Sequence, residues 1–187
     1  MPTELILGGA RSGKSRLAEQ RALDHGGPVT VTVIATAEAG DAEMAARIAR
    51  HRADRPEHWH TIEAPTALAD TLQAAAHADG CVIVDCLTLW LSNLLMHDGA
   101  ELRAPHVADA LPGWQREHAA LLACLPELPG LTILVANEVG LGLVPDSPLG
   151  RLFRDEAGRL NQSVAAVCDR VTFVAAGLPL TLKAPPA

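Results

Sequence analysis

The sequence of 187 residues lacks an uninterrupted apolar segment long enough to cross a membrane. Its longest apolar stretch, residues 81–96, is broken by the polar side chains of Asp85, Thr88, Ser92 and Asn93. The first residues also lack the basic and apolar regions of a signal peptide. These absences predict a protein that is neither exported nor inserted in a membrane.

The cysteines lack any pattern that would join them. The sequence has no CxxC pair and no metal-ligand spacing of cysteines, and each thiol lies in an apolar neighbourhood typical of a protein core. The four residues are Cys81, Cys86, Cys124 and Cys168. They favour a reducing compartment, so we expect a cytoplasmic protein.

Positive charge is in deficit. Lys and Arg total 15 against 22 for Asp and Glu, which gives a net charge of -7. A field of this sign repels polyanions, which argues against nucleic acid as the main partner. The eight histidines include no metal-binding HExxH spacing. A local group of arginines remains able to bind a small phosphorylated ligand.

What the sequence does contain, close to its start, is the phosphate-loop pattern of Gly, four residues, Gly, Lys and Ser. Its residues are Gly8, Gly9, Ala10, Arg11, Ser12, Gly13, Lys14 and Ser15. Glycines let backbone N–H groups surround phosphate oxygens, where a Cβ would obstruct the approach. Lys14 supplies charge to the β- and γ-phosphates, and the Ser15 hydroxyl can bind Mg²⁺. An expected strand at residues 4–7 and helix at 15–25 flank the loop, which predicts a nucleoside triphosphate site; a glycine-rich turn without a ligand is the alternative.

Four further apolar runs rich in β-branched residues predict strands, and the tail can add an edge strand. The four lie at residues 29–35, 81–84, 131–136 and 171–175, and the tail strand at 178–183. Helical stretches between strands imply crossover connections and a mainly parallel sheet covered on both faces. We therefore expect a single domain over residues 1–187, with an α/β, phosphate-loop NTPase-like three-layer fold.

Polar residues stand where these strands end, which is the edge of an open α/β sheet that binds ligands. They are Thr36, Asp85, Asn137 and Glu138. Asp85 follows four apolar residues, as in a Walker B strand, and is expected to bind Mg²⁺ beside Ser15. The alternative is a cap on the next helix. Glu138 could orient a substrate hydroxyl or hold a water bound to the metal, but turn formation by Asn137 explains this segment equally well.

Residues 41–55 predict a helix that is capped by Asp41 and stopped by the proline that follows. Met44, Ile48 and His51 are spaced four and three apart, so they share the apolar face that turns toward the protein. Nearby arginines disfavour imidazolium. A neutral imidazole can attack a nucleotide phosphorus and form a phosphoramidate. From spacing alone, a histidine packed at the edge of the core is the favoured alternative.

Three arginines, Arg151, Arg154 and Arg159, lie near the start of a helix expected at residues 152–166. They could contact phosphate, but ordinary surface ion pairs are the favoured interpretation. A regulatory GTPase is disfavoured for another reason, because the chain has no Asn-Lys-x-Asp motif and no Asp-x-x-Gly after its third strand.

Taken together, several blocks of the sequence resemble one family over the whole span from the first strand to the last. The blocks are the phosphate loop; Ala35-Thr36; residues 41–48 with His51, Arg52, Arg55, Pro56 and Trp59; Asn137-Glu138-Val139-Gly140 with Gly142, Val144 and Pro145; and Phe153-Arg154-Asp155 with Gly158, Arg159, Asn161 and Gln162. They resemble the bifunctional adenosylcobinamide kinase and adenosylcobinamide-phosphate guanylyltransferase of cobalamin synthesis. The resemblance implies that ATP or GTP phosphorylates adenosylcobinamide, and that GMP then passes from GTP through a histidine to adenosylcobinamide phosphate.

By this resemblance His51 is the guanylylated nucleophile, which reverses the preference drawn from spacing, and Lys14 acts in catalysis. The implied nucleotide contacts are residues 8–15, Ala35, Thr36, Ala37, Arg52, Ala53, Asp54, Arg55, Glu63 and Asp85. The metal would be Mg²⁺ on Ser15 and Asp85. Many relatives carry two histidines where this chain has Arg50-His51, and others carry Glu in place of Asp85. Neither change removes a required group.

The family resemblance also implies a homo-oligomer, a trimer in its relatives. Two other classes of function stay open. A simple small-metabolite kinase would transfer the γ-phosphate with no covalent nucleotide. A nucleotide sensor would bind without turnover.

Overall fold

The computed structural model describes residues 2–25, 30–53, 55–99 and 111–185. Its elements follow in the order β1 (Thr3–Gly8), α1 (Lys14–Asp24), β2 (Thr30–Ala35), α2 (Ala42–Ala53), β3 (His60–Glu63), α3 (Leu68–Ala75), β4 (Gly80–Asp85), α4 (Leu87–His97), α5 (Pro112–Cys124), η3 (Leu125–Glu127), β5 (Leu131–Asn137), α6 (Pro148–Val167), β6 (Arg170–Ala175) and β7 (Leu178–Lys183). Strands and helices alternate through most of the chain, as the apolar runs predict.

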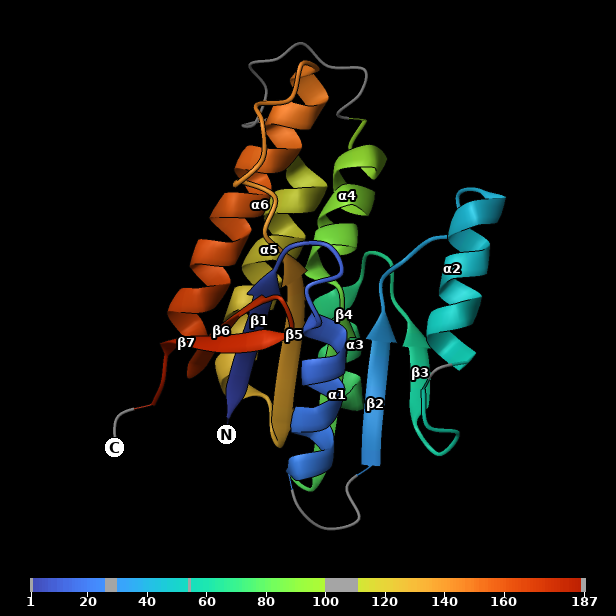
Figure 1. Cartoon of the computed structure of the whole chain (residues 1–187), viewed down its shortest axis with the longest axis vertical. Helices are drawn as coiled ribbons and strands as arrows, with labels where there is room; N and C mark the ends of the chain where they lie inside the picture. Colours follow the sequence, from blue (N-terminus) through green and yellow to red (C-terminus); the bar gives the residue numbers. More distant parts are fainter. Residues whose placement is uncertain (1, 26–29, 54, 100–110, 186–187) are drawn as a thin grey trace.

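The strands of the described residues form one seven-stranded sheet in the order β3-β2-β4-β5-β1-β6-β7 (Figure 1). All neighbouring pairs are parallel except β6 and β7, which are antiparallel. The predicted mainly parallel sheet with a tail strand at its edge is therefore confirmed. The tail strand has the predicted bounds, and the other predicted strands agree with the structure to within one residue at each described end.

The strand register gathers the polar strand ends into one row. Gly8 pairs with Asn137, and Ala35 pairs with both Asp85 and Glu63. Because these strands are parallel, their carboxyl ends lie at the same edge of the sheet. The candidate residues therefore come from five different strands of the chain and still meet in space.

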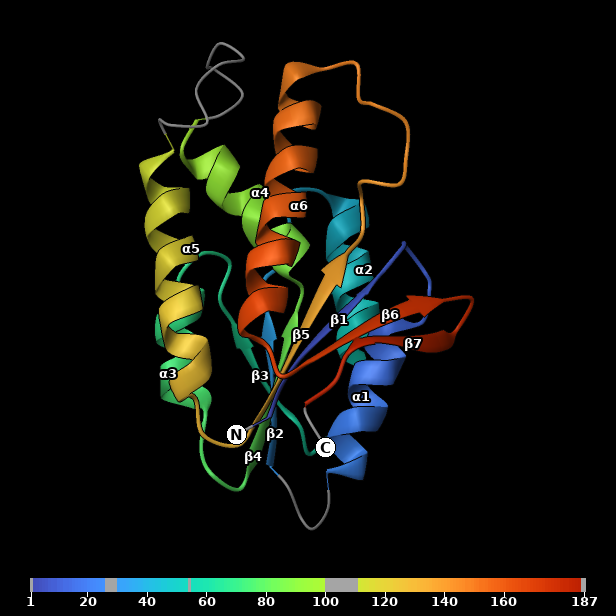
Figure 2. The same cartoon turned by 90° about the vertical axis from the view of Figure 1, so that its left-hand side faces the viewer.

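Apolar side chains of the central strands pack on both faces of the sheet. Leu5 and Leu7 belong to the larger core cluster, which contains residues of α3, α4, α5 and α6, whereas Ile6 belongs to the smaller one with Ala18 and Ala22 of α1. Figure 2 shows the two layers, with α3 to α6 on one side of the strands and α1 on the other. Burial on both faces explains why these strands read as continuous apolar runs.

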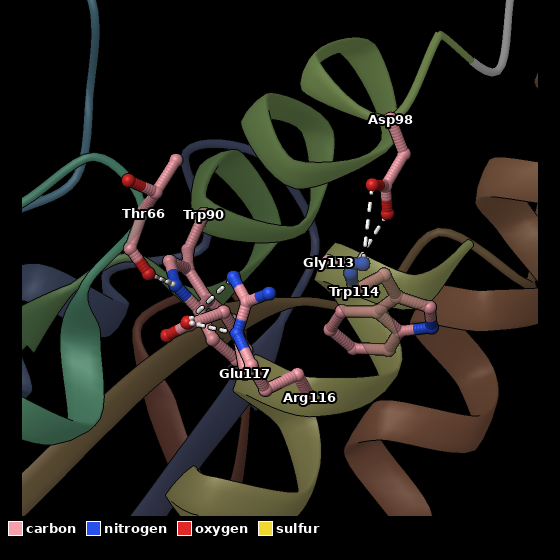
Figure 3. Close-up of polar contacts among 7 residues, drawn as sticks. All are labelled: Thr66, Trp90, Asp98, Gly113, Trp114, Arg116 and Glu117. Atoms are coloured by element: carbon pink, nitrogen blue, oxygen red, sulfur yellow. Dashed lines mark hydrogen bonds and ion pairs between the residues drawn. The ribbon is translucent and has the colours of Figure 1, made fainter.

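Hydrogen bonds between side chains and backbone groups tie the helices of the larger face together. The Asp98 carboxylate, after α4, accepts from the backbone N–H groups of Gly113 and Trp114 at 3.1 and 2.8 Å (Figure 3). It thus satisfies two of the N–H groups that the first turn of α5 leaves unpaired. Trp90 of α4 donates its indole N–H to the Thr66 carbonyl at 2.7 Å. These contacts hold α4 against the start of α5 on one side and against the segment before α3 on the other.

Strand β3 is not among the strands that the apolar runs of the sequence predict. The strand has four residues, and three of them are exposed. This short edge strand is stabilised by pairing with β2, which the hydrophobicity of its own four residues does not predict. Helix α6 also starts four residues earlier than predicted, because the Ser147 hydroxyl caps it by accepting from the Gly150 N–H. In the part of the chain that the structure describes, no helix is both long and apolar enough to span a membrane.

Leu134→Ala should lower the free energy of unfolding by about 2–5 kcal/mol, because its side chain is fully buried in β5 and truncation leaves a cavity. Leu143→Ala is the matched control: the same change at a side chain that is 96% exposed should cost less than about 0.5 kcal/mol. Urea unfolding followed by circular dichroism measures both. Equal losses in the two variants would contradict the assigned burial.

Candidate active site

The loop after β1 is held in shape by backbone contacts. Gly8 lies so close to β6 that a Cβ on it would sit 2.4 Å from the Val174 carbonyl oxygen. Gly13 has a φ of 102°, which side-chain-bearing residues rarely adopt. The Gly8 carbonyl accepts from the Glu138 N–H at 3.0 Å, and the Ser12 carbonyl accepts from the Gly177 N–H at 2.9 Å. The loop is therefore fixed on one side by the end of β5 and on the other by the β6–β7 turn.

Lys14, the first residue of α1, points back into this loop. Its side chain is buried, and Nζ donates to the Gly9 carbonyl at 2.6 Å. Burial lowers the pKa of Lys14, and the negative charge of Asp85 opposes that shift. The ammonium is thus placed inside the loop, as a phosphate-binding lysine requires.

A cavity of about 660 Å³ opens over this loop at the carboxyl edge of the sheet. The loop contributes Ala10, Arg11, Ser12, Gly13, Lys14 and Ser15 to its wall. The sheet contributes Ala35, Ala37, Glu63, Asp85 and Asn137. Helix α2 and the residues after it contribute Met44, Ile48, His51, Arg52 and Arg55. One open cavity therefore brings together most of the residues singled out in the sequence.

Helix α2 lies beyond the β3 edge of the sheet in Figure 1 and meets the cavity with one face. The Asp41 carboxylate accepts from the Met44 N–H at 2.7 Å, which confirms the predicted cap. Met44 and Ile48 are half-buried on the cavity wall, and His51 lines it while remaining exposed overall. The three share one face as predicted, but that face turns to the cavity and not to a packed core. The imidazole is therefore open to a ligand.

Arg55 joins the end of the α2 segment to β4. Its Nη2 lies 3.4 Å from Asp85 Oδ2, and its Nη1 donates to the Thr61 hydroxyl at 3.5 Å. Only 10% of the Arg55 side chain is exposed, so this pair is less screened than a surface ion pair. Arg52 and Glu63 lie 3.7 Å apart, but both are exposed, and such a pair contributes little to stability.

Thr36 has a different place from the other candidates. It is fully buried and absent from the cavity wall, and its hydroxyl donates to the Cys86 carbonyl at 2.7 Å and accepts from the Cys86 N–H at 3.0 Å. Asn93 donates to the Thr36 carbonyl at 2.7 Å. Thr36 therefore holds the backbone that follows Asp85.

Several other candidates also lie off the cavity wall. Gly8 and Gly9 form the start of the loop behind it, and Ala53 ends α2. Glu138 accepts a hydrogen bond from the Gly140 N–H, which fits the turn interpretation of this segment. Asp54 lies outside the described residues.

Sequence reasoning missed several residues of the wall. They are Arg16, Thr61, Cys86, Leu89, Val135, Ala176 and Gly177. Most are apolar or backbone contributors with no pattern of their own. Gly177 alone had a usable signal, because a glycine between two strands marks a turn.

A family model and curated relatives match nearly the whole chain, and they point to the same family. Residues 4–182 match the family model described as "Cobinamide kinase / cobinamide phosphate guanyltransferase". The chain is 56% identical over 183 residues to the "Bifunctional adenosylcobalamin biosynthesis protein CobP" of Pseudomonas aeruginosa, covering 98% of each chain. It is 41% identical to the "Bifunctional adenosylcobalamin biosynthesis protein CobU" of Escherichia coli, covering 96% of this chain and 98% of that one.

A solved structure of an ATPase from the type III secretion system of pathogenic bacteria shares the fold. The TM-score is 0.57 at 14% identity, covering 96% of this chain and 56% of that one. At this identity the likeness speaks for the α/β phosphate-loop fold alone.

Thr36→Val should lower the free energy of unfolding by about 1–3 kcal/mol, because it leaves the buried Cys86 N–H without its partner. It also removes one of the two hydrogen bonds that the Cys86 carbonyl accepts, the other coming from the Trp90 N–H. Thr36→Ser keeps the hydroxyl and should stay close to the wild type. Urea unfolding measures both variants. A Thr36→Val protein of wild-type stability that has lost GTP affinity would make Thr36 a nucleotide contact instead.

Proposed function

Because the chain belongs to the family of cobinamide kinases and cobinamide phosphate guanyltransferases, we propose that its carboxyl-edge cavity carries out both reactions of that family. The chain is accordingly an adenosylcobinamide kinase and adenosylcobinamide-phosphate guanylyltransferase of adenosylcobalamin biosynthesis. One observation carries the assignment to this cavity: His51 of α2 and the phosphate-loop residues Lys14 and Ser15 line the same wall. A nucleotide seated on the loop would then lie within the space that the imidazole faces.

In the kinase reaction, the loop holds the triphosphate of ATP or GTP and Lys14 neutralises charge on the β- and γ-phosphates. The hydroxyl of the aminopropanol arm attacks the γ-phosphorus. The bond from that phosphorus to the β,γ-bridging oxygen breaks, the nucleoside diphosphate leaves, and the hydroxyl proton passes to solvent. Asn137, on the cavity wall beside the loop, is placed to orient the attacking hydroxyl, and we assign Glu138 no more than support of the turn that carries it.

In the guanylyl transfer, an imidazole nitrogen of His51 attacks the α-phosphorus of GTP. The bond to the α,β-bridging oxygen breaks and pyrophosphate leaves. A phosphate oxygen of adenosylcobinamide phosphate then attacks the same phosphorus, and the P–N bond breaks to give adenosylcobinamide-GDP. Splitting the transfer in this way replaces one difficult displacement by two easier ones. Arg52 and Arg55, on the same wall, neutralise charge as the α-phosphate moves.

The residues present also fit Mg²⁺, which prefers oxygen ligands and keeps several waters. Ser15 and Asp85 offer a hydroxyl and a carboxylate on one cavity wall, beside the loop that would hold the phosphates. Among the described residues no group of three or more His, Cys, Asp and Glu could hold a metal by itself, so phosphate and water oxygens would complete the ligand set. When bound, the ion would neutralise charge on the phosphates. Arg55, the ion-pair partner of Asp85, could then turn to the nucleotide.

Glu63 is our choice for recognition of the nucleoside. Its carboxylate lies on the cavity wall at the end of β3 and can accept hydrogen bonds from the guanine edge or a ribose hydroxyl. Its present partner, Arg52, is exposed and loosely paired, so replacing that ion pair by hydrogen bonds to the nucleoside would cost little free energy.

We extend the proposal to a homo-oligomer in the cytoplasm, with a trimer as the family expectation. The edge strand β7 supports association, because Leu178, Leu180 and Leu182 are all exposed along it. The four cysteines are free and buried, in keeping with a reducing compartment.

With Mg²⁺ and GTP labelled at the α-phosphate, and no corrinoid, the wild-type protein should acquire a covalent label that is acid-labile and alkali-stable. His51→Ala should acquire none, while His58→Ala, a nearby histidine off the cavity wall, should label normally. His51→Ala should still phosphorylate adenosylcobinamide, because the kinase step does not use the imidazole.

Other outcomes of this experiment would each overturn a specific part of the proposal. Label that survives in His51→Ala would assign the nucleophile elsewhere. An unlabelled wild type that binds GTP and phosphorylates the corrinoid would be a simple kinase. Binding without any turnover would leave a nucleotide sensor.

Asp85→Asn should raise the Mg²⁺ concentration that half-saturates either reaction by about tenfold or more, because a neutral amide is a poorer ligand for Mg²⁺ than a carboxylate. Titration of initial rates with Mg²⁺ measures the shift. Asp79→Asn, which removes an exposed carboxylate that does not line the cavity, is the control. An unchanged Mg²⁺ dependence in Asp85→Asn would leave Asp85 only as the partner of Arg55.

A further inference from the structure

A second cleft, of about 440 Å³, lies outside the nucleotide cavity. It is lined by Gly140, Arg154, Asp155, Gly158, Arg159 and Gln162. All but Gly140 belong to α6, and Gly140 belongs to the loop that joins β5 to α6. Figures 1 and 2 place this loop beside the N-terminal part of α6, at the end of the sheet that carries the phosphate loop.

The loop between β5 and α6 is tied down and yet presents apolar side chains to solvent. Arg151 donates to the carbonyls of Pro145 and Asp146 at 3.0 and 2.7 Å. The exposed side chains are Leu141 at 83%, Leu143 at 96% and Val144 at 63%. An ordered loop that exposes neighbouring apolar residues beside a cleft marks a binding surface.

The arginines that line the cleft each have an acidic partner, one within the cleft and one beside it. Arg154 lies 3.6 Å from the Asp155 carboxylate, and Arg159 donates to the carboxylate of Glu156. Gln162 adds an uncharged amide. A site for a free anion would leave its arginines without acidic partners, so this lining is better suited to uncharged groups that both donate and accept hydrogen bonds, such as carboxamides.

The second cleft adjoins the nucleotide cavity through a short stretch of chain. Asn137 lines the cavity and Gly140 lines the cleft, three residues later. From the other side, Asn161 of α6 donates to the Asn137 carbonyl at 3.4 Å, and the next residue, Gln162, lines the cleft. A ligand that spans both sites would therefore cross only the start of this loop.

We propose that the cleft and the exposed loop bind the corrin ring of adenosylcobinamide while its aminopropanol arm reaches the nucleotide cavity. A corrin has broad apolar faces and a rim of uncharged carboxamide side chains, which matches exposed leucines beside a charge-paired polar cleft. This inference rests on the proposed function, since it concerns where that function's substrate sits. It assigns Leu143, Gly158 and Gln162 to substrate binding and leaves the GTP half-reaction to the other cavity.

Gly158 offers a selective way to block the cleft. A Cβ added there meets no heavy atom within 4 Å, so a larger side chain projects into open space. The residue lies inside α6, where alanine is favoured over glycine by about 1 kcal/mol. Gly158→Leu should therefore obstruct the cleft without unfolding the helix, and Gly158→Ala is its small-volume control.

Corrinoid binding is measured by equilibrium dialysis of adenosylcobinamide, followed by its visible absorbance, on the full chain without nucleotide. Gly158→Leu should obstruct the ring, and Leu143→Ser should remove an apolar contact with it. Each should weaken binding by about tenfold or more, which corresponds to about 1.4 kcal/mol or more. Gly158→Ala, and Leu23→Ser at an exposed leucine of α1, should bind like the wild type. All four should keep wild-type labelling by GTP, which needs no corrinoid.

The outcomes separate this inference from the proposed function. Wild-type corrinoid affinity in Gly158→Leu and Leu143→Ser would overturn the assigned site while the labelling reaction stands. A wild type that neither labels nor binds adenosylcobinamide would sink the proposed function itself. Should Leu143→Ser lower the oligomeric mass in light scattering but leave corrinoid affinity intact, the loop would be a contact between copies of the chain, and the inference would be wrong.

Discussion

The site depends on how the loop after β1 is held between its two neighbours in the sheet. Hydrogen bonds from Glu138 N–H to the Gly8 carbonyl and from Gly177 N–H to the Ser12 carbonyl fix the loop to β5 on one side and to the β6–β7 turn on the other. The backbone N–H groups of this loop must point at phosphate, so they cannot form the hydrogen bonds of a helix or a strand. The shape of the loop therefore has to come from contacts with the strands beside it. The central position of β1 supplies both neighbours.

Charge is arranged around this loop in pairs that a ligand can rearrange. Lys14 faces the Gly9 carbonyl, Arg55 faces Asp85, and Arg52 faces Glu63. Each of these three cations therefore has an oxygen partner on or beside the cavity wall, and the triphosphate of a nucleotide would offer stronger ones. The partly buried Arg55–Asp85 pair matters most, because burial reduces screening and links the end of the α2 segment directly to the strand expected to carry the metal ligand. Helix α2 and the residues after it can in this way bring both the proposed nucleophile, His51, and a compensating cation, Arg55, to the nucleotide.

The same loop that ends β5 borders both the nucleotide cavity and the cleft on α6. Asn137, the last residue of β5 before this loop, lies on the cavity wall, and Gly140 lines the cleft. The leucines of the loop are exposed to solvent. A bifunctional enzyme of this kind must hold one bulky substrate through two chemistries at one arm. A binding surface separate from the nucleotide loop meets that need, because the nucleotide can be exchanged while the ring stays in place.

The sequence by itself determined the alternation of strands and helices, the phosphate loop, the shared face of Met44, Ile48 and His51, and the row of polar residues at strand ends. These follow from local periodicity and from residue types that few other structures require. It did not determine strand β3, the buried role of Thr36, or the partner of Arg55. Only the tertiary structure decided these, because each depends on a contact between segments far apart in the chain: β3 on pairing with β2, Thr36 on Cys86, and Arg55 on Asp85. Nothing in the local sequence of a residue records what packs against it, so the difference between a group that lines a cavity and one that holds its backbone appears only when the chain is folded.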